Sequence, residues 1–563
     1  MKTCRKLLLV IVTLTLCVGC DENFLETAPK DSIAGNEFWK TVEHAELGVT
    51  AIYNVLREQA YINELGMDDA MTPIAYRYGG NRNWDTMQLY AIVSGNATTR
   101  TRMYNQRWTA LYLGIYRANE AIANIPNMET NLGAQKDQFL GEALFLRGLF
   151  YFDLLNYYGG QDDARHDGVP LYTEPTSFTQ TYKPRSKPSE VRALIIDDLA
   201  QAIDFLPSTG GSVSDGRASK GAAMALLGKV YLYNKQYTEA ANMFKQVIDL
   251  GDYQLGNDYG ALFSLAGEKN TEVIFALQNE GIQDFGGWRD LRYGPASSQA
   301  SAKNSSIPTN YFVDSYRKID GSKFDRAQFL ADFETNNGRA FDWENRDDVN
   351  QYFADRDPRL EASIIRPFSL FVGRNNTTYE FRYPRDTGND PYPCMRTVNN
   401  TNNHYGWRKF VNVGDESAVR RHSGIDYPVI RYADVLLMYA EARNEASAAN
   451  AGNASDDLYW AVNQVRDRVD MPDIPVGTQA EVRDLIREER MIELAAEGMF
   501  YSDFRRWYEN DPSFNLSSLD EDIFDFTGTV KLDTRRSFPG YFLYPIPEAE
   551  RDLNPDLTQN PGW

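Results

Sequence analysis

Cysteine is scarce in this sequence and is concentrated at one end of it. Only four cysteines occur among 563 residues, and three of them, Cys4, Cys17 and Cys20, lie within the first 20 positions. Cys394 is the only cysteine in the remainder. No disulfide can form between residues beyond position 20, so a chain of this size must be stabilised by its own hydrophobic core.

Histidine and the motifs of common enzymes are also scarce. The four histidines, His44, His166, His404 and His422, are scattered without the spacing of metal ligands. No HExxH or GxSxG motif occurs. The sequence therefore gives no support for a catalytic centre, and no cofactor is expected.

Positive charge is outnumbered by negative charge. The sequence holds 58 Lys and Arg against 79 Asp and Glu, which gives a net charge of −21 at pH 7. A surface this acidic repels phosphate backbones. Nucleic acid is therefore not expected as a partner.

The apolar run near the N-terminus is too short to span a bilayer. Residues 7–16 are apolar and follow the positive residues Lys2, Arg5 and Lys6, a pattern typical of a secretory signal, whereas a spanning helix needs roughly 20 apolar residues. The small residues before Cys20 resemble the lipobox of bacterial lipoproteins, which implies cleavage at this cysteine and its acylation. Cys17 stands where that motif usually has Leu. An ordinary signal peptide with incidental cysteines is the alternative.

Most of the remaining chain is predicted to be helical. Residues 224–251 match the spacing of a tetratricopeptide (TPR) repeat, a pair of packed helices. In that pattern small residues let the two helices approach, and aromatic residues fill the space between repeats. The matching residues are Leu227, Gly228, Tyr231, Ala240, Phe244 and Val247.

Further amphipathic segments suggest that several such helix pairs stack. Leu111, Ile115, Ala118 and Ile122 fall on one helical face. Because an isolated helix pair cannot bury its apolar face, stacked pairs are expected to form a right-handed superhelix. The predicted fold class is therefore all-α dominated, with TPR-like repeats, long irregular loops and minor β content.

Long polar segments rich in aromatic residues interrupt the helices. Residues 66–101 form one, and residues 279–427 form a larger insert rich in Gly, Ser, Asn and Tyr. Loops of this length are uncommon unless they are functional or disordered, and their aromatic content favours function. The expected organisation is a signal peptide at 1–19, a lipidated tether at 20–37 and one domain at 38–563. Its helices occupy mainly 38–278 and 428–508, the insert lies between them, and an extended segment fills 509–563.

Six segments along the chain together resemble the SusD/RagB family of outer-membrane lipoproteins. In chain order they are "CDENFLETAPKDSI", "EALFLRGLFYFDLLNYYGG", "GRASKGAAMALLGKVYLYNKQY", "YPVIRYADVLLMYAEARNEA", "REERMIELAAEGMFYSDFRRW" and "YPIPEAERDLNPDLTQNPGW". The resemblance implies a TPR-containing surface protein that binds a glycan, or in some members a peptide. It also implies a lid over a SusC-like TonB-dependent transporter, anchored in the outer membrane through a lipid on Cys20.

Two glycine-flanked loops carry the residue types that bind sugars. Sugar rings pack on flat aromatic rings, and their hydroxyls bond to polar side chains around the ring. "YRYGGNRNWD" and "GGWRDLRYG" combine both types. The candidate residues are Tyr76, Tyr78, Asn81, Arg82 and Trp84 in the first loop, and Trp288, Arg289 and Tyr293 in the second.

The family resemblance adds a role for two of these residues and leaves alternatives for the others. Sugar-binding tryptophans of related proteins lie in equivalent loops, which implies this role for Trp84 and Trp288. All these rings could instead cover the helical core. Trp343 is a further loop candidate, whereas Trp407 and Trp507 lie in segments that look structural.

A set of carboxylates raises the question of catalysis. Glu489, Glu493 and Glu497 are spaced four residues apart, so they share a helix face and could mimic the paired acids of a glycosidase. Because Arg487 and Arg490 are interleaved with them, a surface ladder of ion pairs is the simpler interpretation. The expected function is thus non-catalytic glycan capture. Peptide or other nutrient capture is the alternative, and a surface glycoside hydrolase is a remote one.

Overall fold

The structure is a computed structural model that describes most of residues 38–563. It leaves out residues 58–67, 78–83, 177–181, 209–215, 283–284, 299–303, 386–387, 389, 398–400, 416–421 and 510, and for residues 84–88 it describes the backbone alone. The expected signal peptide and tether therefore lie outside the described residues. Within the described ranges, no helix is both long and apolar enough to cross a membrane.

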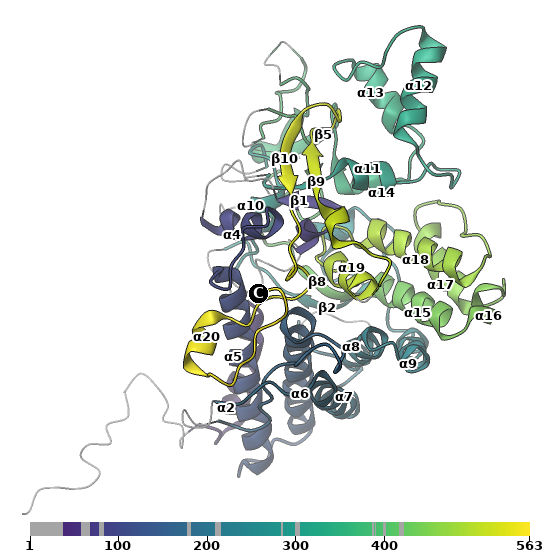
Figure 1. Cartoon of the computed structure of the whole chain (residues 1–563). Helices are drawn as coiled ribbons and strands as arrows, with labels where there is room; N and C mark the ends of the chain where they lie inside the picture. Colours follow the sequence, from purple (N-terminus) through teal and green to yellow (C-terminus); the bar gives the residue numbers. More distant parts are fainter. Residues whose placement is uncertain are drawn as a thin grey trace, which may run out of the picture.

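Helices packed side by side form the body of the protein. They are α2 (Val42–Leu56), α5 (Arg102–Asn124), α6 (Gln135–Leu154), α7 (Pro188–Phe205), α8 (Lys220–Tyr233), α9 (Tyr237–Asp249), α15 (Tyr432–Ala446), α16 (Ala448–Ala451), α17 (Asp457–Asp467), α18 (Gln479–Leu494) and α19 (Phe500–Tyr508). In chain order, α6 packs against α5 and α7, and α8 packs against α7 and α9 (Figure 1). The later helices join this array because α15 packs against α9, α17 and α18. The prediction of a mainly helical, TPR-like fold is confirmed.

The α8–α9 pair shows how the sequence sets helix packing. The Ser219 side chain caps α8 by accepting a hydrogen bond from the Ala222 amide at 3.2 Å, which satisfies an amide at the helix start. Gly228 lies against Phe244, and a Cβ on this glycine would stand only 2.6 Å from the Phe244 ring. The glycine in the repeat pattern therefore lets the two helices approach.

Short strand pairs connect distant parts of the chain. The five antiparallel pairs in the described part are β1 (Ala75–Arg77) with β3 (Ser306–Pro308), β2 (Val273–Leu277) with β8 (Tyr427–Arg431), β4 (Ile364–Ile365) with β7 (Gly406–Trp407), β5 (Leu370–Gly373) with β6 (Thr377–Glu380), and β9 (Glu521–Phe524) with β10 (Lys531–Arg535). The β2–β8 pair brings together the two ends of the insert, because Leu277 pairs with Tyr427.

The insert and the C-terminal segment contain short helices of their own. In the insert these are α10 (Arg289–Tyr293), α11 (Asn310–Ser315), α12 (Arg326–Asn337), α13 (Arg346–Phe353) and α14 (Arg359–Ser363). Two further helices are α4 (Trp84–Val93) in the first loop region and α20 (Glu548–Leu553) near the C-terminus. In Figure 1, α4 lies to the left of β1, against which it packs.

Candidate functional site

Trp288 lies on a loop held firmly by backbone hydrogen bonds. It precedes α10 as the N-cap residue, and its side chain is half-buried. The preceding residue, Gly287, exchanges two backbone hydrogen bonds of 2.8 Å with Ser423. The indole meets the His422 ring edge-on at a centroid distance of 6.4 Å, and the Arg292 guanidinium lies 5.7 Å from the indole. The ring is thus fixed in place while part of it remains open to solvent.

Arg289 and Asp290 point inward and fasten α10 to the scaffold. The Arg289 guanidinium lies 3.4 Å from the centre of the Tyr427 ring and 4.8 Å from that of Phe410. Asp290 is fully buried and accepts hydrogen bonds from the Asn412 side chain at 2.9 Å and the Asn412 amide at 3.3 Å. Arg289 was expected to contact sugar hydroxyls, but only 8% of it is exposed. Its cation–π contacts instead position the start of the helix.

The two described tyrosine candidates are also packing residues in this structure. Tyr293 is 1% exposed, lies beside Trp407 with ring centres 6.0 Å apart, and donates a hydrogen bond to the Ala496 carbonyl. Burial raises the pKa of Tyr293 far above its usual range. Tyr76 on β1 is fully buried and donates to the Thr534 carbonyl. Neither ring has the exposed face that stacking on a sugar requires, which corrects the expectation for both.

The first candidate loop lies largely outside the described residues. Tyr78, Asn81 and Arg82 belong to the segment left out, and Trp84 begins α4 without a described side chain. The backbone is nevertheless informative, because α4 packs against β1 and α10 packs against its partner strand β3. The structure thus packs the helix that begins at Trp84 and the helix that follows Trp288 against opposite strands of one ribbon. Their joint action in sugar binding stays a prediction.

Phe285 and Ile282 form an exposed apolar turn just before Trp288, which the sequence reasoning missed. They are 50% and 53% exposed. Arg57 holds this turn by donating hydrogen bonds to the Gln278 and Phe285 carbonyls, and its guanidinium lies 4.9 Å from the Phe285 ring. The glycines that follow Phe285 were a usable signal, because they flank this ring as they flank Trp288. We call Ile282, Phe285 and Trp288 the Trp288 surface.

The loop candidate Trp343 and the two tryptophans expected to be structural, Trp407 and Trp507, all lie in packed surroundings. Trp343 is half-buried in an aromatic cluster, with its ring centre 4.9 Å from Phe341 and 5.1 Å from Tyr352. Trp407 is 1% exposed. Trp507 is 9% exposed, and its indole N–H donates to Glu441 at 2.9 Å. These positions explain why the surrounding segments look structural in the sequence.

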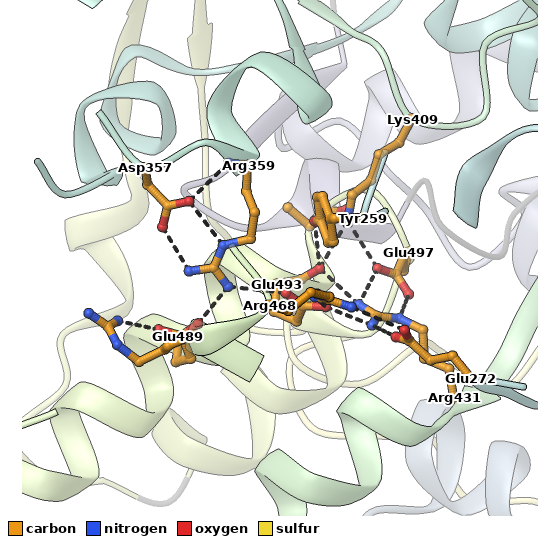
Figure 2. A network of polar contacts seen from close by, with 12 residues as sticks. Tyr259, Glu272, Asp357, Arg359, Lys409, Arg431, Arg468, Glu489, Glu493 and Glu497 are labelled. Carbon is orange, nitrogen blue, oxygen red and sulfur yellow. Dashed lines mark hydrogen bonds and ion pairs between the residues drawn. The ribbon is translucent and has the colours of Figure 1, made fainter. Parts of the chain in front are cut away.

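The glutamates once considered as glycosidase acids lie inside the protein. Glu489, Glu493 and Glu497 are 3%, 0% and 0% exposed, so the expected ladder at the surface is wrong. Figure 2 shows that they belong to a network of polar contacts between distant segments. We call this set the buried charge network; it comprises Glu272, Asp357, Arg359, Lys409, Arg431, Arg466, Arg468, Glu489, Glu493 and Glu497.

Arginines from other elements neutralise these carboxylates. Arg431 lies 2.7 Å from Glu272, from Glu493 and from Glu497. Arg359 bridges Glu489 at 2.5 Å and Glu493 at 3.1 Å. Burial alone would raise the pKa of Glu493, but the surrounding guanidinium groups hold it well below its usual range. Because Glu489, Glu493 and Glu497 are buried and paired with cations, they are out of reach of a substrate, which indicates a structural role for this set.

The interleaved arginines also differ from the expected ladder. Arg490 is buried and pairs with Asp434 at 2.9 Å and with Asp503 at 2.6 Å. Arg487 lies on the outer side of α18 with its guanidinium 4.9 Å from the Trp507 ring. Among the residues that the structure describes, no group of three or more His, Cys, Asp and Glu is placed to hold a metal ion.

Comparison with known proteins identifies the family. Residues 271–563 match the model described as "SusD family", and residues 23–232 match the model described as "Starch-binding associating with outer membrane". A SusD-like protein of Formosa agariphila, P38, is 27% identical over 538 residues, which cover 89% of each chain.

Solved structures show the same fold. A SusD-like carbohydrate binding protein from Bacteroides fragilis superposes with a TM-score of 0.72 at 24% identity, over 92% of this chain and all of the other. Surface glycan-binding protein A from Bacteroides fluxus superposes with a TM-score of 0.68 at 21% identity, over 93% of this chain and all of the other. Since the family model covers more than half of the sequence, the chain belongs to the SusD family.

Proposed function

We propose that the protein captures an oligosaccharide or polysaccharide at the cell surface without cleaving it. The observation that carries this proposal is Trp288, whose indole is partly open on a loop fixed by Gly287 and by the inward contacts of Arg289. A flat ring held in place loses little conformational freedom when a sugar packs on it. Less of the favourable contact energy between ring and sugar is therefore offset by lost entropy. Membership of the SusD family supports the same ligand class.

The bound glycan would then pass to a SusC-like TonB-dependent transporter in the outer membrane. In this proposal a lipid on Cys20 tethers the protein, which acts as a lid over the transporter. Tethering gives a high effective concentration at the pore, so a modest affinity is enough. Dissociation constants between millimolar and micromolar, roughly −4 to −8 kcal/mol, allow both capture and release.

Affinity electrophoresis tests the glycan proposal directly. The soluble chain from residue 21 onward is run through native gels that contain amylopectin, laminarin, galactomannan or alginate. We expect at least one of these polysaccharides to retard it, with no release of reducing sugar in solution. Retardation by none of them, together with binding to a peptide library, would favour the peptide alternative. Release of reducing sugar would establish an enzyme instead.

Two alanine variants and a matched control locate the site. Trp288→Ala and Trp84→Ala should each abolish most of the retardation while the thermal unfolding midpoint changes little. Trp460→Ala removes an indole that is 43% exposed on α17, away from the proposed site. This control should migrate as the unmodified protein does. Unchanged retardation in both test variants would contradict the proposed site.

A further inference from the structure

A hollow lined partly by aromatic residues lies at the surface between α11, α18 and α19. Its volume is about 570 Å³, which is within the range of small-molecule sites. We call it the Tyr311 groove. Its lining includes Tyr311, Lys323, Asp484, Arg487, Trp507 and Tyr508.

Two tyrosines line this groove and differ in how they are held. Tyr311 on α11 is 54% exposed. Tyr508 ends α19, is half-buried, and packs its ring against Phe504 at 4.9 Å and Phe514 at 4.7 Å between centres. The groove thus combines the accessible ring of Tyr311 with the ring of Tyr508, which Phe504 and Phe514 hold in position.

The polar residues of the groove carry both signs of charge. The Arg487 guanidinium lies 4.9 Å from Trp507 and 5.6 Å from Tyr508, and among the described residues it forms no ion pair. Asp484 is exposed on the same helix, and Lys323 is exposed on the opposite side. Donors and acceptors are therefore available for hydroxyl groups. With Asp314 and Glu488 also in the lining, carboxylates outnumber cations by three to two, and this excess, in a chain with a net charge of −21, disfavours acidic saccharides.

The groove and the Trp288 surface lie at opposite ends of the β1–β3 ribbon. At the start of β3, the Ser305 amide donates to the Arg292 carbonyl of α10 at 2.8 Å. At the other end, Thr309 bonds to the Pro73 and Ile74 carbonyls and caps α11, which carries Tyr311. Three strand residues span about 10 Å. The two surfaces are therefore separate sites joined by one rigid element.

We propose that the Tyr311 groove is a second binding site for a neutral saccharide chain, acting beside the Trp288 surface. This inference rests on the proposed glycan capture. A long polysaccharide would engage both sites, and the second contact would slow its release without new contacts at the first. A short oligosaccharide would occupy one site at a time.

The test uses Tyr311→Ala and Arg487→Met in the soluble chain from residue 21 onward. The probe is whichever of amylopectin, laminarin and galactomannan retards the unmodified protein. Each variant should weaken retardation by about two- to tenfold, the range for loss of one aromatic contact. Tyr311→Phe keeps the ring and should retain binding. Tyr392→Ala removes a tyrosine that is 39% exposed elsewhere and should behave as the unmodified protein does.

The outcomes separate the two proposals. If the neutral polysaccharide retards the unmodified protein and retardation is unchanged in Tyr311→Ala and Arg487→Met, the second site is refuted and glycan capture stands. If no polysaccharide retards the unmodified protein, both proposals fail. Tyr311→Ala should weaken the residual retardation of Trp288→Ala by the same factor as in the unmodified protein, because separate sites contribute additively. Retardation by alginate alone would overturn the neutral ligand class.

Discussion

The buried charge network and the Trp288 surface both contain arginines and carboxylates, but these residues serve different purposes in the two regions. In the network, arginines and carboxylates from distant segments satisfy one another, and Glu493 is enclosed by several guanidinium groups. At the Trp288 surface, Arg289 and Asp290 turn inward and leave an indole partly open. Polar residues therefore fix the architecture in both regions. Only the second region has an aromatic surface left for a ligand.

The largest expected effect comes from breaking the network at Arg431. Arg431→Met leaves Glu272, Glu493 and Glu497 without their shared cation, and we expect a loss of about 3–5 kcal/mol in the free energy of unfolding. Denaturant unfolding measures it. Arg100→Met is the control, because Arg100 pairs with Glu548 while its side chain is 77% exposed, and an exposed pair screened by solvent contributes little to stability. Equal losses in the two variants would contradict the distinction.

A smaller effect is expected at Arg289, which holds the start of α10 next to Trp288. Arg289→Met removes the cation that lies over Tyr427, and we expect about 2 kcal/mol of destabilisation. If Arg289 positions α10, glycan retardation should also fall by about tenfold. Arg289→Lys should recover part of the retardation because it restores a cation. Weakened stability with full retardation would show that the contact does not position Trp288.

Asp69 and Glu493 are both buried acids, but their pKa values shift in opposite directions. Burial raises the pKa of Asp69 to about 7, whereas arginines keep that of Glu493 low. Between the ordinary Asp value of 3.8 and about 7, the folded state holds a proton on Asp69 that the unfolded state releases. This contribution to stability is present at low pH and is lost as pH rises through 7, with a slope of up to about 1.4 kcal/mol per pH unit. Asp69→Asn should reduce the slope of the unfolding free energy between pH 5 and pH 7, to which Glu268 and Asp426 also contribute because burial raises their pKa values; an unchanged slope would contradict the assignment.

The smallest effect is expected at the exposed turn before Trp288. Phe285→Ala removes a ring that is 50% exposed, so stability should change by less than about 0.5 kcal/mol. If the turn belongs to the binding surface, retardation should weaken by about threefold. A change in stability without a change in retardation would place Phe285 in the scaffold.

Local patterns in the sequence predicted local packing well. The spacing of Gly228 and Phe244 predicted a close helix pair, and the two do pack together. The role of Arg289 was not accessible in this way, because its partner Tyr427 lies in another segment that only the fold brings near. The same holds for Glu493, whose arginine partners lie 25, 62 and 134 residues away. The sequence shows only the residues near Glu493 along the chain, and these favour a surface ladder of ion pairs with Arg490.

The pairing of β2 with β8 brings the two ends of the insert together. Since Leu277 and Tyr427 stand opposite each other, the insert leaves and re-enters the helical body at adjacent points. Doubling the length of a flexible connection adds only about 0.6 kcal/mol to the cost of closing it. The loop that bears Trp288 can thus change in length at little cost, whereas the insert segments that carry Arg359 and Lys409 are bound to α18 and its C-terminal end through the buried charge network.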